Sequence, residues 1–285
     1  MSLSKIDTHT HTTEIAKGDR FAFGDNWTQF LKTLNDDRID EAVNDIKKML
    51  GIDNLNGKTF LDIGSGSGLH SLAAKRLGAD RVYSFDYDPS SVACTAELKR
   101  RYYENDDRWT VEEGSALDGD YLQRLGTFDI VYSWGVLHHT GDMYRALELV
   151  DGCVKPDGRL FLAIYNDQGA MSQVWLRIKK TYNSAPRFIR PLIVGLCYIR
   201  LWGPTTIKDF LKLRPFYTWR SYAKNRGMSA HTDVIDWVGG YPFEVAKPEA
   251  IFNFYRAKGY QLEQLFTCGG GIGCNQFVFG KGELI

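Results

Sequence analysis

The sequence predicts an α/β protein built on a Rossmann-like, doubly wound sheet, and three patterns support this prediction. Segments of strand and helix character alternate from residue 58 to residue 165, which is typical of βαβ units and a parallel sheet. A glycine-rich turn follows the first strand. The alternation resumes at residue 248 and ends in two consecutive strands, which indicates an antiparallel hairpin at the end of the sheet. We therefore expect seven strands, mostly parallel, with a helical cap inserted before the last part of the sheet.

The first 54 residues are expected to form an N-terminal helical segment. Residues 2–20 show no periodicity and are predicted to be loose, with His9 and His11 as tail residues and not metal ligands. Residues 21–50 carry apolar side chains at helical spacing. Gly51 is suited to follow the last helical residue, because glycine readily adopts a positive φ.

The elements of the sheet follow in order along the chain. Strands are expected at 59–63, 81–85, 109–112, 128–133 and 159–165, the last after a Lys-Pro-Asp-Gly turn at 155–158. Helices are expected at 69–77, 90–103, 121–125, 143–150 and 248–258, and two final strands at 261–267 and 275–279. The sheet domain then comprises 55–165 and 248–285, and 166–247 is a basic, aromatic-rich helical cap.

Composition excludes several classes of protein. A chain of 285 residues with 44% hydrophobic and 25% charged residues is neither disordered nor fibrous. The five cysteines are odd in number and form no C-x-x-C pair, which favours a reducing, cytoplasmic setting without disulfides or a zinc site. We expect no metal, no signal peptide and no transmembrane segment.

Equal numbers of basic and acidic residues, 35 of each, conceal an asymmetry. Residues 171–228 contain twelve Lys or Arg and one acid, Asp209, so this segment carries +11 and the remainder −11. Two interpretations remain open. The basic side chains are simply solvated, or they form a surface for an anionic acceptor, a membrane interface or RNA.

The glycine-rich turn has the sequence LDIGSGSG from Leu61 to Gly68. Its spacing is not the dinucleotide pattern G-x-G-x-x-G, because position 69 is Leu. Glycines at a strand-to-helix junction let the backbone approach a ligand closely, and the helix N-terminus offers free N–H groups to an anion. Asp86 ends the second strand, where its carboxylate can accept the hydroxyls of a ribose.

These motifs resemble the class I S-adenosylmethionine-dependent methyltransferases, over roughly residues 55–166 and 248–280. The segment FDIVYSWGVLHHT, residues 128–140, is most similar to the quinone-biosynthesis (ubiquinone/menaquinone) type. The resemblance implies S-adenosylmethionine as cofactor, S-adenosylhomocysteine as product, and an N-terminal lid with Trp27 as its candidate cover. The implied cofactor-binding residues are Asp62, Gly64, Ser65, Gly66 and Gly68 for the methionine end, Asp86 for the ribose, Tyr87, Ser115, Ala116 and Leu117 for the adenine, and Ser133 and Trp134 near the sulfonium.

One position departs from the family pattern. The family often has an acid after the glycine that follows the third strand, whereas this chain has Ser115. The adenine amino group would then depend on a serine hydroxyl or a backbone carbonyl as its acceptor.

Candidate catalytic residues are His138 and His139 after the fourth strand, and Asn166 after the fifth. An imidazole there can take a proton from an acceptor near neutral pH. The alternative for both histidines is structural, with one packing and one bonding to backbone, and Asn166 equally suits a turn or helix cap.

The leading functional hypothesis is O- or C-methylation of a small-molecule acceptor: a phenolic or quinol-like compound, a glycan, an anionic or lipid-linked compound, or a natural product. The alternative is an RNA (tRNA) methyltransferase that uses the basic insertion. A third is a non-catalytic, cofactor-binding partner of a larger complex. The sequence does not indicate an oligomeric state.

Overall fold

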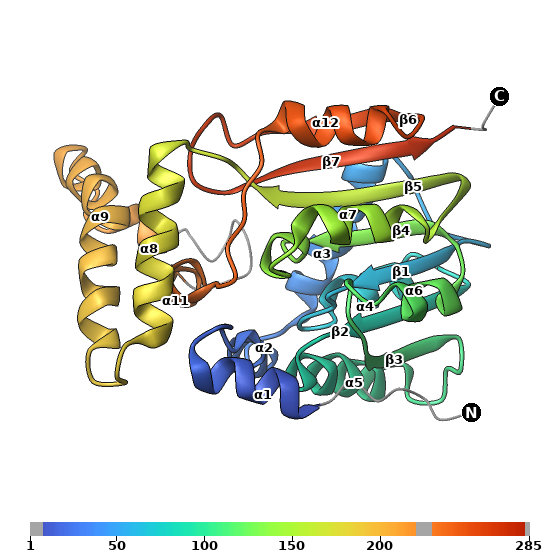
Figure 1. Ribbon diagram of the computed structural model, residues 1–285, viewed down its shortest axis with the longest axis horizontal. Coiled ribbons are helices and arrows are strands. Elements are labelled where there is room, and N and C mark those ends of the chain that lie inside the picture. The colour runs from blue at the N-terminus through green and yellow to red at the C-terminus, as the bar shows by residue number, and fades with distance from the viewer. Residues whose placement is uncertain (1–7, 221–229, 283–285) are drawn as a thin grey trace.

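The computed structural model describes residues 8–220 and 230–282 of the chain. These residues form a seven-stranded sheet in the order β3-β2-β1-β4-β5-β7-β6 (Figure 1). The strands are β1 (Thr59–Ile63), β2 (Arg81–Asp86), β3 (Trp109–Glu113), β4 (Phe128–Trp134), β5 (Val154–Tyr165), β6 (Tyr260–Phe266) and β7 (Cys274–Lys281).

Strand direction follows the pattern that the sequence predicts. β1 to β5 pair in parallel, and β7 runs antiparallel between β5 and β6. Strand order reverses between β1 and β4, and at such a switch point an open α/β sheet binds its ligand, outside the carboxyl ends of the strands. The Rossmann-like fold with an antiparallel last hairpin is therefore confirmed.

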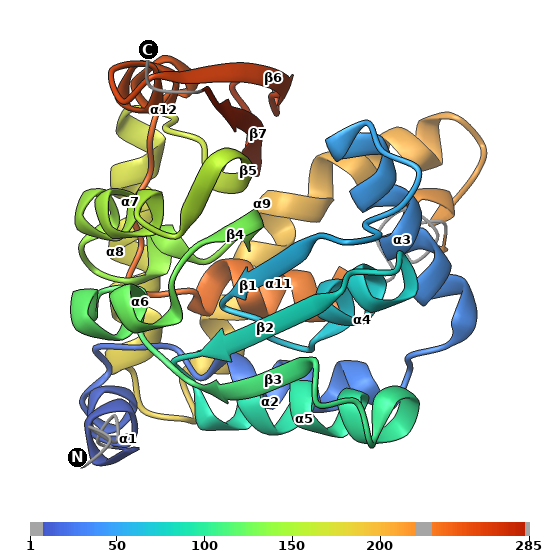
Figure 2. The same ribbon diagram turned by 90° about the vertical axis from the view of Figure 1, so that its right-hand side faces the viewer.

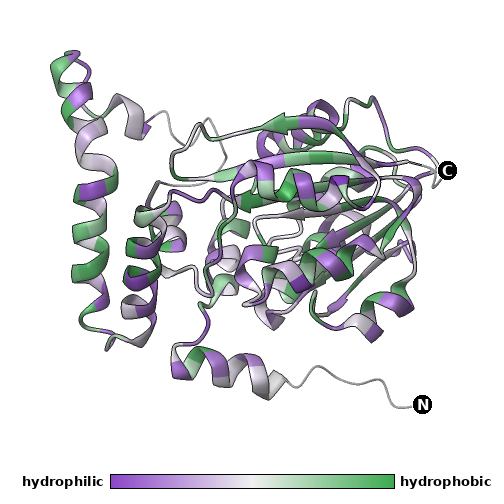
Figure 3. Cartoon of the chain, turned by 45° about the horizontal axis from the view of Figure 1, so that its top comes forward, coloured by the Kyte–Doolittle hydropathy of each residue, from purple (hydrophilic) through white to green (hydrophobic). Residues whose placement is uncertain are grey.

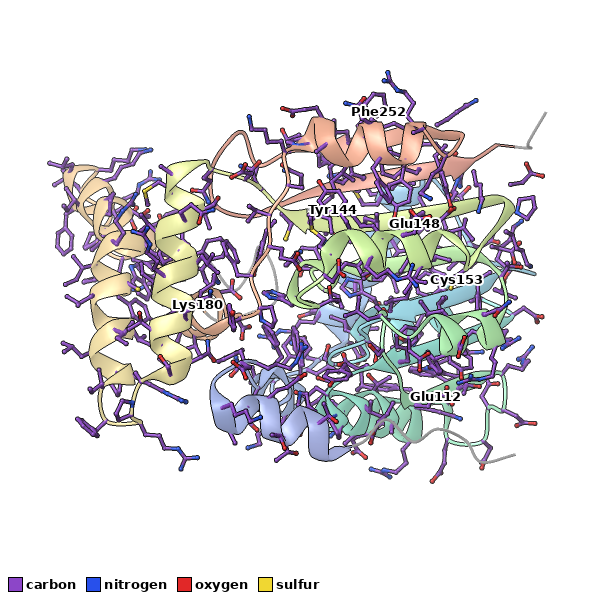
Figure 4. The ribbon with its side chains drawn as sticks, in the orientation of Figure 1. Glu112, Tyr144, Glu148, Cys153, Lys180 and Phe252 are labelled. Atoms are coloured by element: carbon purple, nitrogen blue, oxygen red, sulfur yellow. The ribbon has the colours of Figure 1, made fainter. Side chains whose placement is uncertain are left out.

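Helices cover both faces of the sheet (Figure 2). One face packs against α3 (Asp36–Leu50), α4 (Leu69–Arg76) and α5 (Pro89–Tyr103), and the other against α6 (Gly119–Leu125), α7 (Met143–Asp151) and α12 (Pro248–Arg256). The helices of the second layer also contact each other (Figure 4): the Tyr144 ring of α7 lies 5.9 Å from that of Phe254, and Glu148 pairs with Lys258 of the α12 end at 2.8 Å.

Aspartates fix where three helices begin. Asp88, Asp118 and Asp142 each precede a helix, and their side chains accept hydrogen bonds from backbone N–H groups of its first turn. Such caps satisfy donors that the helix itself leaves unpaired. Because Asp88 and Asp118 follow β2 and β3, the caps also shape the loops at the carboxyl edge of the sheet.

A separate group of helices lies beyond this carboxyl edge (Figure 1). It consists of α8 (Ala170–Ser184), α9 (Arg190–Leu211) and α11 (Ala230–Gly239), which share their own apolar cluster. Trp175, Cys197 and Trp237 contribute one buried side chain from each helix. The predicted helical character of 166–247 agrees with these helices, while the domain boundaries themselves stay predictions.

Two expectations for the chain are corrected by the structure. Residues 2–20 are not loose throughout, because Thr8–Lys17 forms α1, and His11 on this helix is buried 3.9 Å from Asp88 instead of lying in a tail. The helical stretch 21–50 is two helices, α2 (Phe23–Leu31) and α3, because the Asn35 side chain caps α3 and starts a new helix. Gly51 does follow α3, with φ 61°.

The start of β5 also differs from expectation. The strand begins at Val154, ahead of the predicted turn, and its register with β4 shifts between Phe128 and Ile130. Asp157 has φ 59°, so the predicted turn residues form an irregularity inside the strand and not a boundary before it.

Candidate functional site

A cavity of about 950 Å³ lies at the carboxyl ends of the central strands. This volume is at the upper end of the range of ligand pockets in proteins. Loops after the strands, the N-terminal helices and the helices beyond the carboxyl edge all contribute to its wall. The strand loops provide Asp62 to Ser67, Asp86 to Asp88, Gly114 to Leu117 and Trp134 to Val136, and the surrounding helices provide Phe23, Trp27, Leu201, Trp202, Asp236 and Trp237.

The loop after β1 approaches its neighbours so closely that glycine is required at two positions. Gly64 has φ 74°, and a Cβ atom there would lie 2.4 Å from both methyl carbons of Val136. Gly66 has φ 54°, and its Cβ would lie 3.0 Å from the indole of Trp27. Both the left-handed backbone and the close contacts exclude larger residues. The loop thus presents bare backbone to the cavity.

Asp62, which is buried, and Asp86, which is partly exposed, place two carboxyl groups beside this loop. Asp62 accepts a hydrogen bond from the Ser71 hydroxyl at 2.5 Å, and Asp86 accepts from the backbone N–H groups of Gly66 and Asp88 at 2.9 Å each. Burial raises the pKa of Asp62 to about 7 and that of Asp86 to about 6, against the opposing effect of these hydrogen bonds.

No ion pair of the described residues involves either Asp62 or Asp86. A carboxylate has about four acceptor positions, so Asp86 can accept further hydrogen bonds beside its two backbone donors. The pair therefore fits a ligand that brings hydroxyl donors to Asp86 and a positive charge near Asp62.

The other predicted cofactor residues divide into two groups. Ser65, Tyr87, Ser115, Ala116, Leu117 and Trp134 line the cavity with Asp62, Gly64, Gly66 and Asp86. Gly68 and Ser133 are not among the described residues of its wall: Gly68 caps α4, and the Ser133 hydroxyl donates to the Ile63 carbonyl at 3.2 Å. The Ser115 hydroxyl accepts from the Leu117 N–H at 3.2 Å and keeps its proton for a further acceptor.

The N-terminal helices close over the end of β2. The backbone N–H of Gly24 donates to the Asp88 carboxylate at 2.8 Å, and the Arg20 guanidinium lies 4.7 Å from the centre of the Tyr87 ring. Arg20 also donates to the His139 carbonyl at 3.0 Å. These contacts join the N-terminal segment to two sides of the cavity.

His138 and His139 point in different directions, and their neighbours fix their tautomers. His138 Nδ1 accepts from the Tyr165 N–H at 3.3 Å, so its proton is on Nε2, which is buried with no partner among the described residues. His139 Nδ1 lies 2.6 Å from the Pro242 carbonyl, so it carries the proton and leaves Nε2 as an acceptor. Burial lowers the pKa of both, that of His139 to about 3. His139 lines the cavity, and His138 is not among the described residues that do.

Asn166 connects the end of β5 to the glycine-rich hairpin turn. Its side chain donates to the Gly271 carbonyl at 3.1 Å and accepts from Asn275 at 3.0 Å. Asn166 is also not among the described residues of the cavity wall. Its hydrogen bonds hold the loop whose residues Ile272 and Gly273 line that wall.

Sequence reasoning missed two ionisable side chains near the cavity, the buried Lys179 and the partly buried Asp236. Lys179 of α8 donates to the Trp237 carbonyl and lies 4.6 Å from the centre of that indole ring. Asp236, on the cavity wall, accepts a hydrogen bond from the Asn26 side chain. Burial lowers the pKa of Lys179 to about 7 and raises that of Asp236 to about 7. Lys179 follows Trp175 by one helical turn, so the two side chains share a face of α8. This spacing could have predicted that Lys179 lies on the apolar face of the helix.

Comparisons with known proteins match part of the chain to a methyltransferase domain and to parts of two relatives. Residues 61–160 match the family described as "Methyltransferase domain". The chain is 31% identical over 120 residues to a tRNA U34 carboxymethyltransferase of Methylococcus capsulatus, covering 42% of this chain and 36% of that protein. It is 43% identical over 63 residues to the ribosomal protein L11 methyltransferase of Bacillus cereus, covering 22% and 20%. The chain thus spans about a third or less of the length of these relatives.

Among solved structures, the fold is similar to that of the magnesium protoporphyrin IX methyltransferase of Synechocystis PCC 6803 with bound S-adenosylmethionine. The TM-score is 0.53 at 12% identity, and the match covers 98% of this chain and 100% of that one. At this identity the likeness concerns the fold.

Residues 61–160 thus match a methyltransferase domain, and the fold is similar to that of a methyltransferase solved with bound S-adenosylmethionine. The motif LDIGSGSG begins at the first residue of the matched region, and the matched region contains Asp86 and residues 115–117. Among the described residues, no group of three or more His, Cys, Asp or Glu side chains is arranged to hold a metal ion.

Proposed function

We propose that this protein methylates a small-molecule acceptor that has a flat, apolar part. The observation that carries the proposal is the composition of one cavity: aromatic rings of Phe23, Trp202 and Trp237 line the same space as the carboxyl groups of Asp62 and Asp86. Apolar pockets with a few convergent polar groups are typical of small-molecule sites. The resemblance of residues 128–140 to quinone-biosynthesis enzymes favours a phenolic or quinol-like acceptor, methylated on oxygen or carbon.

The residues present fit the cofactor. Asp86 would accept the ribose hydroxyls, Asp62 lies where the α-ammonium group would be neutralised, and residues 115–117 would border the adenine. Gly64 and Gly66 line the cavity without a side chain, so their backbone could contact the methionine part directly. Trp27, in contact distance of Gly66, supports an N-terminal lid over this part of the site.

The methyl donor, when bound, supplies an activated methyl group on a sulfonium. The chain's own residues then have to align the acceptor for in-line displacement and exclude water. The donor would supply both the methyl group and the leaving thioether, so the transfer needs no further co-reactant. A hydroxyl acceptor also loses a proton, and a base within the cavity has to take it.

Two cavity residues could act on the acceptor hydroxyl, and we propose that one takes its proton while the other orients it. Asp236 has a pKa raised to about 7, which suits a general base at neutral pH. His139, with its pKa lowered to about 3, is neutral and can accept a hydrogen bond at Nε2, which orients a hydroxyl. We propose that His138 and Asn166 position the β4 and β5 loops through their backbone bonds.

RNA as acceptor is less well supported. Asp233 and Asp236 line the cavity beside Trp237, and carboxylates there would repel a phosphate backbone. The match to the tRNA-modifying relative covers only 36% of that protein.

The proposal is tested by calorimetric titration with S-adenosylmethionine, followed by transfer of a labelled methyl group to a panel of phenols, quinols and bulk tRNA. We expect micromolar cofactor binding and methylation of a phenolic or quinol acceptor. Methylation of tRNA alone would overturn the small-molecule proposal, and tighter binding of NAD than of S-adenosylmethionine would overturn the assignment of the cofactor.

A further inference from the structure

The inner face of helix α9 packs against the neighbouring helices. Its side chains Val194, Cys197 and Leu201 pack into the apolar cluster shared with α8 and α11. Leu201 and its neighbour Trp202 also line the cavity. This face therefore joins the helix to the methyltransferase domain and forms part of the wall of its active site.

The outer face of α9 carries an exposed apolar stripe. Leu192, Leu196 and Ile199 follow one another at helical spacing and are 65%, 60% and 71% exposed. Ile207 and Phe210 continue the same face at 62% and 52%. Single exposed apolar residues are ordinary, but a continuous stripe marks an interaction site. We call these five residues the outer stripe. α9 is the outermost helix of the molecule, and hydrophobic and hydrophilic residues alternate along it (Figure 3).

Positive charge accompanies the outer stripe without a compensating acid. Arg200 and Lys208 of α9, and Lys212 and Arg214 just after it, are exposed. Asp209, the single acid of residues 171–228, is buried and accepts two hydrogen bonds from Thr218 at 2.8 Å each. The surface around the outer stripe is therefore apolar and basic, with its one carboxylate turned inward.

We propose that the outer stripe and its basic flank bind to the surface of an anionic lipid bilayer. An apolar stripe of this kind enters the boundary between headgroups and acyl chains, while Lys and Arg attract anionic headgroups. A bilayer surface covers both the apolar stripe and the basic side chains. A nucleic acid would contact the basic side chains and leave the aliphatic stripe in water, and a second copy of this basic face would be repelled. Among the residues described, no helix is long and apolar enough to cross a bilayer.

The orientation has a consequence for the active site. α9 contributes Leu201 and Trp202 to the cavity on one side and the outer stripe on the other. Binding at the bilayer would hold the cavity wall next to the lipid surface, where an apolar or lipid-linked acceptor is concentrated. The surface itself needs neither cofactor nor acceptor, so its test is independent of the proposed function.

The test is co-sedimentation of the full chain with vesicles, without methyl donor. One set is pure phosphatidylcholine and the other an equimolar mixture with phosphatidylglycerol. We expect binding to the mixed vesicles at least about tenfold tighter than to the neutral ones. The variant L192S/L196S/I199S and the variant R200E/K208E should each lose at least about tenfold of this binding.

A matched control replaces two exposed apolar residues elsewhere, Val174 of α8 and Leu265 of β6, by serine. It should bind like the unmodified chain, and thermal unfolding should show that all variants are folded. Loss of binding in the charge variant but not in the stripe variant would overturn the proposal in favour of a purely electrostatic polyanion surface. A dimer that the stripe variant dissociates, with no vesicle binding, would assign the stripe to a second copy of the chain.

Discussion

The Asp86 carboxylate accepts a hydrogen bond of 2.9 Å from the backbone N–H of Gly66, so the end of β2 is tied directly to the glycine-rich loop after β1. The same carboxylate accepts from the N–H of Asp88, whose own side chain caps α5 and binds Gly24 of the N-terminal segment. One carboxyl group thus contacts the loop, the second strand end and, through Asp88, the N-terminal helices. Changes at this residue should act on cofactor binding before they act on the acceptor.

Replacing Asp86 by Asn should weaken S-adenosylmethionine binding by about 10- to 100-fold, because hydrogen bonds to a charged acceptor are worth about 1.5–3 kcal/mol. Calorimetric titration measures the change. Asp120, an acid in the first turn of α6 that is not among the described cavity residues, provides the control as Asp120→Asn. Unchanged affinity in the Asp86 variant would contradict the assigned ribose contact.

Trp27 should limit how fast the cofactor leaves. Its indole lies against Gly66 in the cavity wall, so Trp27→Ala should raise the dissociation rate and KM for S-adenosylmethionine several-fold. Trp27→Phe should retain most of the cover. Stopped-flow tryptophan fluorescence would follow dissociation. Equal rates in the Ala and Phe variants would show that the side chain does not act as a cover.

Asp236 should determine how kcat depends on pH below about pH 7. Because burial raises its pKa to about 7, the base form is gained as pH rises through this value, and kcat should rise with it. Asp236→Asn should lower kcat by about 100-fold or more and weaken this dependence on pH. Asp233→Asn, on the same helix and the same cavity wall, is the matched control. If the Asp236 variant kept the kcat of the unmodified protein and the same dependence of kcat on pH, Asp236 would be excluded as the base.

Lys179 should make stability depend on pH in the alkaline range. Burial lowers its pKa from 10.5 to about 7, so between these values the unfolded chain binds more protons than the folded one. Its contribution to the free energy of unfolding therefore rises with pH from about 7 to 10.5. Urea unfolding at several pH values should show this slope reduced in Lys179→Met. The same slope in both proteins would place the Lys179 pKa near its ordinary value.

Local sequence patterns predicted the fold, and they singled out many of the residues that line the cavity. Strand–helix alternation and the direct succession of the last two strands define the sheet, because each is a short-range property of the chain. The glycines at 64 and 66 and the acid at 86 were recognisable because their roles depend on backbone conformation and on their position at a strand end. Two features were not predicted from the sequence. The boundary between α2 and α3 depends on a single cap, the Asn35 side chain, and the helix Thr8–Lys17 contacts residues that are distant in the sequence, such as Asp88.

The sequence by itself determined the architecture of the sheet, the position of the glycine-rich loop and the separation of charge along the chain. Only the tertiary structure decided which of two adjacent histidines lines the cavity, because their ring directions depend on Pro242 and Tyr165. It also decided that Lys179 is buried while Arg200 and Lys208 are exposed, although all three contribute equally to the charge of the segment. Charge is a property of the residue, but its hydration and its partners are set by the packing of helices that are far apart in the sequence.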